Sequence, residues 1–464
     1  MKLSYLFSIV ISLIVIDSIA QNNSFFYEVE LNSGVSSEKT LPFWMTANKF
    51  GKIPNSNYAL TTATFGKSFS NNNSNKIDFA FKGSITGSIA EENDAIINEL
   101  YASLKYKKVR LDIGSKNDEI VFEGLSSSNG NFMKSTNSRA IPGYNLSTVD
   151  FIELPFAKNW LKFKATYGDF WMNDERYVDN TLLHQKSLHF KSKINNKLDI
   201  ITGVNHYAQW NGTSLSSGKQ PSGFKNYIKT VTGSSGGSEA SILEQINALG
   251  NHLGSYILQF DYKGTKTNWN FYISHPFEDR SGRELMNYPD NLYGFFLDLK
   301  KEKALITHAL AEITYTKHRS GNAPHYTDET GYHAASGRDE YFNNFVYLSG
   351  WSYFKNVIGT PYILTNDKEY GTDLSLNRFV ALHVGIKGFV KNIGYKMNID
   401  YINFDNWYDS NENMDYNQFS TYFEINPKLD KIPFEFYLGS SIDLGNLSKN
   451  NIGGFIKIIK KGKF

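Results

Sequence analysis

From Asp78 to Leu444 the chain alternates between apolar and polar residues, in stretches about as long as a membrane-crossing strand. Successive side chains of a β-strand point to opposite faces, so each stretch predicts one apolar face and one polar face. Between Arg378 and Lys391 the positions of one parity, which would form the polar face, include His383 and Lys387. The apolar parity of the same segment consists of Val380, Leu382, Val384, Ile386 and Val390.

The same alternation recurs in Leu161 to Tyr167, Trp269 to Ile273 and Phe434 to Leu444. It predicts many antiparallel strands that separate an apolar from an aqueous environment. A soluble β-sandwich also alternates, so the pattern alone leaves both architectures open.

The first twenty residues predict export from the cytoplasm. Lys2 precedes an apolar run from Leu3 to Ile16, and Ser18 to Ala20 has the small-x-small form of a signal peptidase site. We therefore expect residues 1–20 to be a cleaved signal peptide that directs the chain through the inner membrane. No later apolar run approaches the roughly 20 residues of a transmembrane helix.

Composition favours the membrane barrel. Aromatic residues make up 15% of the chain, with 29 Tyr and 34 Phe, as two interfacial girdles require. No linker divides residues 21–464, so we predict a single outer-membrane domain: an all-β, transmembrane antiparallel β-barrel of about 18 strands, surrounded by outer-membrane lipid. A last strand ending in Phe464 resembles the signal read by the barrel assembly machinery, the partner expected during biogenesis.

Charge and cysteine content add exclusions. The net charge is +2, and Lys and Arg are spread along the polar parity without clustering, so nucleic acid is not an expected partner. The absence of cysteine excludes disulfides and thiol chemistry.

Connections of two kinds are expected. Short connections such as Lys107 with Lys108, or Asn392, allow only tight turns, and we expect these turns on the periplasmic side of the barrel. The long polar loops are the expected location of the functional residues. Within one long loop, Glu239 to Leu249 has apolar residues at helical spacing, which predicts a short helix packed inside or over the pore, or on the loop surface. The four long loops are Asn117 to Ser147, Asn211 to Gly254, Phe277 to Asn291, and Lys317 to Asn344.

Seven separated sequence blocks occur in order along almost the whole mature chain: Leu41–Gly51, Gly124–Ser128, Asn137–Pro142, Asn247–Gly254, Asp290–Gly294, Gly337–Asn344 and Ser349–Trp351. Together these blocks resemble the Wzi capsule assembly proteins in their Bacteroidetes-type form. The resemblance implies an outer-membrane barrel of about eighteen strands whose loops close the lumen, acting as a lectin that holds capsular polysaccharide or exopolysaccharide at the cell surface. Enteric relatives carry a periplasmic helical piece near the N-terminus, whereas Phe26 to Leu31 here predicts a strand.

Glycan binding needs aromatic faces for sugar rings, guanidinium groups for carboxylates and amides for hydroxyls. Loop residues of these types form the predicted polysaccharide-binding set. They are Arg139, Asn251, His252, Arg338, Asp339, Tyr341, Asn343 and Trp351.

Structural roles remain open for several of these residues. Arg338 and Arg139 could lock loops in place through ion pairs, as charged residues inside barrels commonly do. Trp351 could be a girdle or plug residue, and His252 a satisfied histidine at a helix end.

Enzymatic and metal-binding functions are not expected, and no cofactor is predicted. His308 and Glu312 lie four residues apart on one strand, too far along it to act as a catalytic pair. Asp409 to Asp415 opens like a calcium loop, but Met414 and Ser420 replace its glycine and its bidentate glutamate.

The alternative function is an outer-membrane porin for oligosaccharides. A barrel of about eighteen strands is wide enough for a channel, so the fold does not separate the two functions. The loops separate the two functions, because a porin keeps an open constriction in its lumen, whereas four long loops favour a closed lumen.

Overall fold

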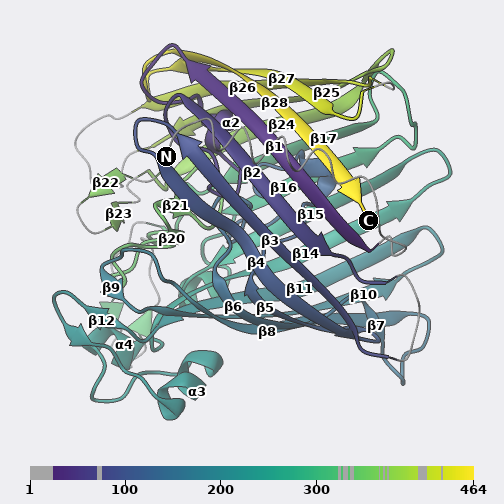
Figure 1. Cartoon of the computed structure of the whole chain (residues 1–464). Helices are drawn as coiled ribbons and strands as arrows, with labels where there is room; N and C mark the ends of the chain where they lie inside the picture. The colour runs from purple at the N-terminus through teal and green to yellow at the C-terminus, as the bar shows by residue number, and fades with distance from the viewer. Residues whose placement is uncertain are drawn as a thin grey trace.

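The computed structural model describes residues 24–70, 76–321, 326–327, 333–334, 339–364, 366–368, 371–373, 376–405, 415–429 and 432–464. Eighteen long strands in this part of the chain form one closed antiparallel barrel (Figure 1). Each strand pairs with the next long strand in sequence, and the first pairs with the last, where Leu31 lies opposite Ile458. The predicted fold class and strand number are therefore confirmed.

The barrel strands are β1 (Phe25–Ser36), β2 (Tyr58–Lys67), β3 (Asp78–Ile89), β4 (Asp94–Tyr106), β5 (Val109–Ser115), β6 (Pro142–Thr148), β8 (Leu161–Trp171), β10 (Leu182–Lys193), β11 (Leu198–Trp210), β14 (Asn251–Lys263), β15 (Asn268–Phe277), β16 (Asn291–Asp298), β17 (His308–Tyr315), β24 (Phe379–Val390), β25 (Ile393–Phe404), β26 (Tyr416–Pro427), β27 (Glu435–Gly445) and β28 (Asn451–Lys463). The segment from Phe26 to Leu31 is thus part of the first barrel strand, as expected.

The remaining elements are short and belong to the segments that connect the barrel strands along the chain. The helices are α2 (Phe43–Thr46), the 3-10 turn η1 (Phe122–Gly124), α3 (Phe224–Thr232), α4 (Ile242–Ile246) and α5 (Arg280–Arg283). The short strands are β7 (Ile152–Glu153), β9 (Val178–Asp179), β12 (Thr213–Ser214), β13 (Gly218–Lys219), β18 (Tyr326–Thr327), β19 (His333–Ala334), β20 (Ser352–Tyr353), β21 (Asn356–Val357), β22 (Asn366–Lys368) and β23 (Gly371–Asp373). No helix in the described part of the chain is long and apolar enough to cross a bilayer.

Strand β24 shows how the alternation builds the wall. Its apolar parity faces outward, with Leu382 47% and Val390 52% exposed. The opposite parity faces the lumen, where His383 is buried and bonds to Asp400 of β25 at 2.8 Å. The outward parity does not pack on a second sheet, so the barrel is distinguished from a sandwich.

The two ends of the barrel differ in loop length. The tight turns at Lys107 and at Lys391 lie at the same end as Phe464, whose amide donates to the carbonyl of Phe25. We call the opposite end, which carries the long connections, the long-loop end. In outer-membrane barrels the short turns are periplasmic, and by that rule the long-loop end faces outward from the cell.

Three loops fold into the lumen, and we call their buried segments the plug: residues 41–48, 122–138 and 341–363. Their apolar side chains join inward residues of the wall in one buried core. Trp351, Phe132 and Tyr362 are fully buried there. Closure of the lumen by long loops agrees with the prediction.

Inward carboxylates of the strands fix the plug. Glu312 of β17 accepts hydrogen bonds from the Ser126 hydroxyl at 2.6 Å and from the Ser127 amide at 2.7 Å. Asp400 accepts from the Trp44 indole, and Asp443 of β27 accepts from the Phe43 amide at 2.8 Å. Each carboxylate therefore satisfies loop donors that would otherwise be buried without a partner.

The predicted helix between Glu239 and Leu249 is shorter than expected. The helix α4 spans only Ile242–Ile246, and the loop also contains α3, which the sequence analysis missed. Both lie beside the strand cylinder at the long-loop end (Figure 1). Of the two placements that the sequence left open, the position of α4 agrees with a helix on the loop surface, and the short helix within the plug is α2. The neighbouring α3 packs on outward side chains of the wall, including Asp169, which accepts from the Tyr227 hydroxyl at 2.8 Å.

Candidate functional site

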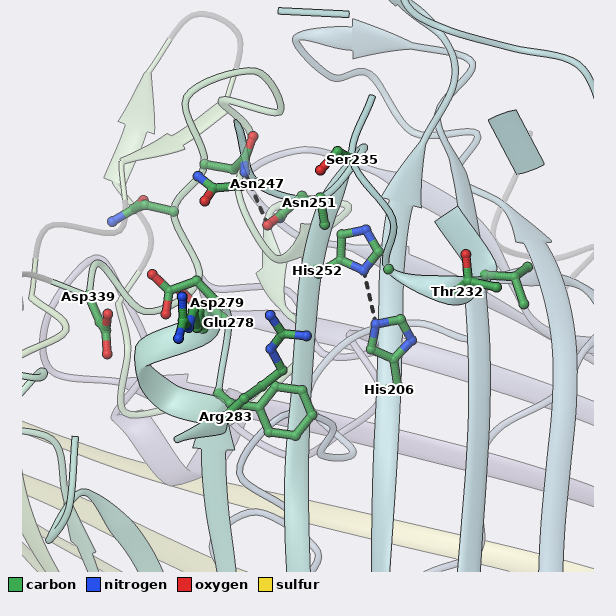
Figure 2. A pocket seen from close by; sticks show the side chains of 18 of the residues that line it. His206, Thr232, Ser235, Asn247, Asn251, His252, Glu278, Asp279, Arg283 and Asp339 are labelled. Atoms are coloured by element: carbon green, nitrogen blue, oxygen red, sulfur yellow. Dashed lines mark hydrogen bonds between the residues drawn. The ribbon is translucent and has the colours of Figure 1, made fainter. Parts of the chain in front are cut away.

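A cleft of about 1280 Å³ opens on the outer side of the barrel rim at the long-loop end (Figure 2). Its floor is the outward face of β10, β11 and β14. One wall is the end of α3 and the chain around α4, and the other is α5 with the end of β15. Residues 339–348, which lead into the plug, border its upper edge.

The floor changes in polarity along its length. Deep in the wall it is formed by the outward side chains of Leu188, Val204 and Tyr256. Nearer the rim it carries His206 and His252 from neighbouring strands, and above them the amide side chains of Asn247 and Asn251 (Figure 2). The cleft therefore joins an apolar end to a polar end.

The two histidines form a relay with a defined direction. His252 Nε2 lies 2.9 Å from the carbonyl oxygen of Leu249, so this nitrogen donates. Its Nδ1 then accepts from His206 Nε2, at 2.9 Å. The remaining nitrogen, His206 Nδ1, is buried and has no protein partner. It is an acceptor to which a ligand hydroxyl can donate.

The wall formed by α3 and α4 is held by outward groups of the strands and by its own caps. The Tyr227 hydroxyl also bonds to that of Tyr167 at 2.6 Å. The helix α4 begins with a capping box, in which Ser241 and Glu244 bond to each other's backbone amides. Glu244 also accepts from the Gly250 amide at 3.0 Å, which ties the helix to the start of β14.

The opposite wall places a guanidinium group in the cleft. The Asp279 carboxylate caps α5 by accepting from the Ser281 amide at 2.8 Å. Figure 2 shows Arg283 projecting from α5 toward the histidine pair. Its side chain is exposed and has no ion-pair partner among the residues that the structure describes.

Acidic loop residues beside the cleft are partly neutral, because they are buried. Burial raises the pKa of Asp339 to about 6, and the carboxylate of Asp279 nearby adds to the increase. Burial likewise raises the pKa of Glu278 well above its usual range, although this side chain accepts from the Phe342 amide at 2.7 Å. Arg283 has no ion-pair partner in the described part of the chain, and it shares this wall with the carboxyl groups of Asp279 and Asp339.

Four of the predicted binding residues line the cleft: Asn251, His252, Asp339 and Asn343. Asn251 is buried, donates to Gln209 at 2.7 Å and accepts from Asn344 at 3.2 Å, so it braces the rim. Asp339 accepts from Ser281 at 3.0 Å and thereby joins α5 to the plug segment.

The other predicted residues lie elsewhere. Tyr341 is fully buried and donates to Asp290 at 2.7 Å, and the Trp351 indole donates to the Met133 carbonyl at 2.6 Å. Both are plug residues, so their prediction as binding residues is not supported by their positions. Arg139 pairs with Asp94 at 3.3 Å and covers the Phe354 ring, as a loop lock would. Arg338 lies outside the described residues.

The sequence analysis missed His206, Tyr256 and Arg283, which face the cleft from two strands and from α5. His206 interrupts the apolar parity of an otherwise lipid-facing strand near the rim, and that was the available signal, whereas the aromatic Tyr256 fits this parity and gives none. Arg283 carries no such signal, because only the fold of its loop directs it to this wall.

The described residues form neither a nucleophile elbow nor a cluster of metal ligands. The segment Gly233 to Gly237 has Gly-x-Ser-x-Gly spacing, but it follows the helix α3, whereas a nucleophile elbow joins a strand to a helix. Among the described residues, no three His, Asp or Glu side chains gather as metal ligands would. Of the segment that opens like a calcium loop, Asp409 to Asp415, residues 409–414 lie outside the described part.

A second cavity of about 440 Å³ lies inside the lumen, beneath the plug. Its charged side chains are largely paired, as in Lys52 with Glu30 at 2.8 Å and Lys82 with Glu99. Burial lowers the pKa of Lys49, which directly follows the plug segment 41–48, to about 7, and its ammonium lies 4.6 Å from the centre of the Tyr422 ring.

Comparison with known proteins gives no matching family model and no similar curated sequence. Among solved structures, the chain is similar to Wzi from Escherichia coli, described as an outer membrane protein involved in group 1 capsule assembly and a carbohydrate-binding β-barrel. The TM-score is 0.58 at 12% identity, over 94% of this chain and 84% of that one. OprD from Pseudomonas aeruginosa (TM-score 0.47, 8% identity, 95% of each chain) and OccD3 from the same organism (0.49, 10%, 97% and 93%) match less well. At these identities the comparison establishes an outer-membrane type of barrel.

Proposed function

We propose that this protein is a non-enzymatic, Wzi-type outer-membrane barrel of the Bacteroidetes form that binds capsular polysaccharide or exopolysaccharide and holds it at the cell surface. The observation that carries the proposal is a lumen filled by the plug and a ligand-sized cleft outside it. A barrel that seals its lumen and opens a cleft at its rim is suited to binding at the surface.

The cleft has the groups that a saccharide needs. Asn247 is exposed beside it, with a side-chain amide that can bond to sugar hydroxyls. The unpaired nitrogen of His206 accepts one more hydroxyl.

The alternative function, an oligosaccharide channel, needs a continuous aqueous path through the barrel. The inward carboxylates Glu312, Asp400 and Asp443 hold the plug across that path. We therefore prefer the surface-binding function and give the channel a direct test in the Discussion.

Binding is tested with the purified barrel and surface polysaccharide isolated from the parent bacterium. Asn247→Ala removes an exposed amide that has no bond in the fold, and we expect about a fivefold weaker affinity, or about 1 kcal/mol. The matched control is Asn93→Ala, an exposed asparagine in the β3–β4 turn at the same end. No measurable binding by the wild-type barrel would contradict the proposal.

In cells, deletion of the gene should release polysaccharide into the medium. Complementation with the wild-type gene should restore retention. Full retention of polysaccharide by the deletion strain would contradict a holding function.

A further inference from the structure

The cleft does not end at the rim but continues down the lipid-facing wall. Val204 lies six residues below Trp210, the end of β11, or about 15 Å along the barrel axis at the usual rise and tilt of barrel strands. The neighbouring Leu188 is 40% exposed and belongs to the outward, lipid-facing parity of β10. The deep part of the cleft is therefore within the apolar band of the barrel.

The wall formed by α3 and α4 is also directed toward lipid. Phe224 is 79%, Ile242 74% and Ile246 64% exposed, and Ile246 borders the cleft. Apolar side chains on amphipathic helices beside a bilayer enter the boundary between headgroups and acyl chains. This wall therefore stands in the outer leaflet, and the cleft opens sideways into it.

Cationic and polar groups lie at the level between the apolar wall and the rim. The unpaired Arg283 points toward the histidine pair from one side (Figure 2). On the other side, Lys186 of β10 donates to the Val231 carbonyl at the end of α3. A guanidinium group at headgroup depth is a binding site for a phosphate.

We infer that the cleft binds a phosphorylated, acylated glycolipid of the outer leaflet. An acyl chain lies along Leu188 and Val204, a phosphate contacts Arg283, and the sugar reaches His206 and the amides at the rim. This inference rests on the proposed function and names the substrate class of its site: saccharide that is attached to lipid.

The order of the contacts selects this occupant. A water-soluble saccharide would leave the apolar floor unused, whereas a phospholipid would offer no sugar hydroxyl to the rim amide of Asn247 or to the orphan nitrogen of His206. A glycolipid has an apolar end and a sugar end, which match the apolar floor and the polar rim of the cleft.

The test uses the full-length barrel in detergent micelles and measures affinity for three probes by native mass spectrometry and competition. The first probe is lipid A linked to its core oligosaccharide, the second is the same molecule after complete deacylation, and the third is phosphatidylglycerol. We expect the intact glycolipid to bind at least ten times more tightly than either of the others.

Two variants locate the site. Val204→Trp fills the apolar floor from an outward position, where tryptophan is well tolerated, and should weaken binding of intact glycolipid about tenfold. Arg283→Ala should weaken it about fivefold and should abolish the preference for phosphorylated over dephosphorylated probe. The controls are Ile313→Trp, at an outward position of β17 outside the cleft, and Lys428→Ala, an exposed cation near the short turns. Heat-resistant gel migration confirms that each variant is folded.

The outcomes separate this inference from the proposed function. Equal affinity for intact and deacylated glycolipid overturns the lipid part and leaves surface saccharide binding in place. No binding of those two probes or of purified surface polysaccharide overturns the proposed function as well. Phosphatidylglycerol binding as tightly as glycolipid, or Val204→Trp behaving like Ile313→Trp, overturns the assignment of the occupant or of the site.

Discussion

Glu312 is the clearest case of a single side chain that holds the lumen closed. Its two oxygens accept from the Ser126 and Ser127 hydroxyls, the Ser127 amide and the Tyr272 hydroxyl, which together connect a barrel strand to the plug. This carboxylate stabilises the fold because all of its donors are bonded to it. If the carboxylate is removed, each donor remains buried without a hydrogen-bond acceptor, which destabilises the fold.

We predict that Glu312→Leu lowers the free energy of unfolding by roughly 3 kcal/mol. The measurement is the temperature at which the barrel loses its compact migration on a gel. Glu119→Gln, at a side chain that is 81% exposed, serves as the control and should leave that temperature unchanged. A Glu312→Leu protein as heat-resistant as the wild type would show that the carboxylate does not anchor the plug.

Asp290 predicts a pH dependence of the rim loops. Burial raises its pKa from 3.8 to about 6, although it accepts from the amides of His318 and Arg319 and from Tyr341. The folded loop therefore binds a proton more tightly than the unfolded loop. Its contribution to stability is full below about pH 4 and is lost as the pH rises through 6.

Hydrogen exchange of residues 278–290, corrected for the intrinsic rate, should thus show stronger protection at pH 5 than at pH 7.5. In Asp290→Asn this difference should shrink, because the amide does not titrate. A larger protection at pH 7.5 in the wild type would contradict the sign of the pKa shift.

The predicted site residues show what residue type can reveal. Asn251, His252, Asp339 and Asn343 were predicted to bind polysaccharide from their chemistry and their motif blocks, and the structure brings these four together at the cleft. Tyr341 and Trp351 belong to the same motif blocks but point into the plug. Residue type gives hydrogen-bonding capacity, whereas the direction of a loop side chain depends on contacts made far away in sequence.

At the scale of elements, the strands could be predicted because their period of two is local. The orientation of the β24 side chains could be predicted from the alternation of this strand alone, with Leu382 outward and His383 inward. The position of α3 could not be predicted in this way. It depends on Asp169 of β8, an outward carboxylate that accepts from Tyr227 and from Tyr144 and bonds to His184.

We predict that Tyr227→Ala detaches α3 from the wall. The loss of its ring contacts and two hydrogen bonds costs about 2 kcal/mol, which raises the open population of this loop about thirtyfold. Trypsin cleavage at Lys225 and Lys229 should accelerate accordingly, while the barrel keeps its heat resistance. Tyr288→Ala, at an exposed loop tyrosine, is the control. Unchanged cleavage in Tyr227→Ala would refute this anchoring role.

At the scale of the whole molecule, the barrel separates two tasks between its inside and its outside. Loops that enter the lumen build a buried core and close it, and loops that stay outside it build a cleft on the outer side of the barrel rim. A barrel of this width is large enough for a channel, so the fold by itself leaves the function open. The arrangement of the loops favours surface binding.

Planar-bilayer recording of the purified barrel tests this account most directly. The wild-type protein should insert into the bilayer and show no steady conductance. The double variant Glu312→Ala, Asp400→Ala releases the plug from β17 and β25 and should conduct under the same conditions. Its current also shows that the barrel inserts under these conditions. A stable open current through the wild-type barrel would contradict the sealed lumen and support the oligosaccharide channel.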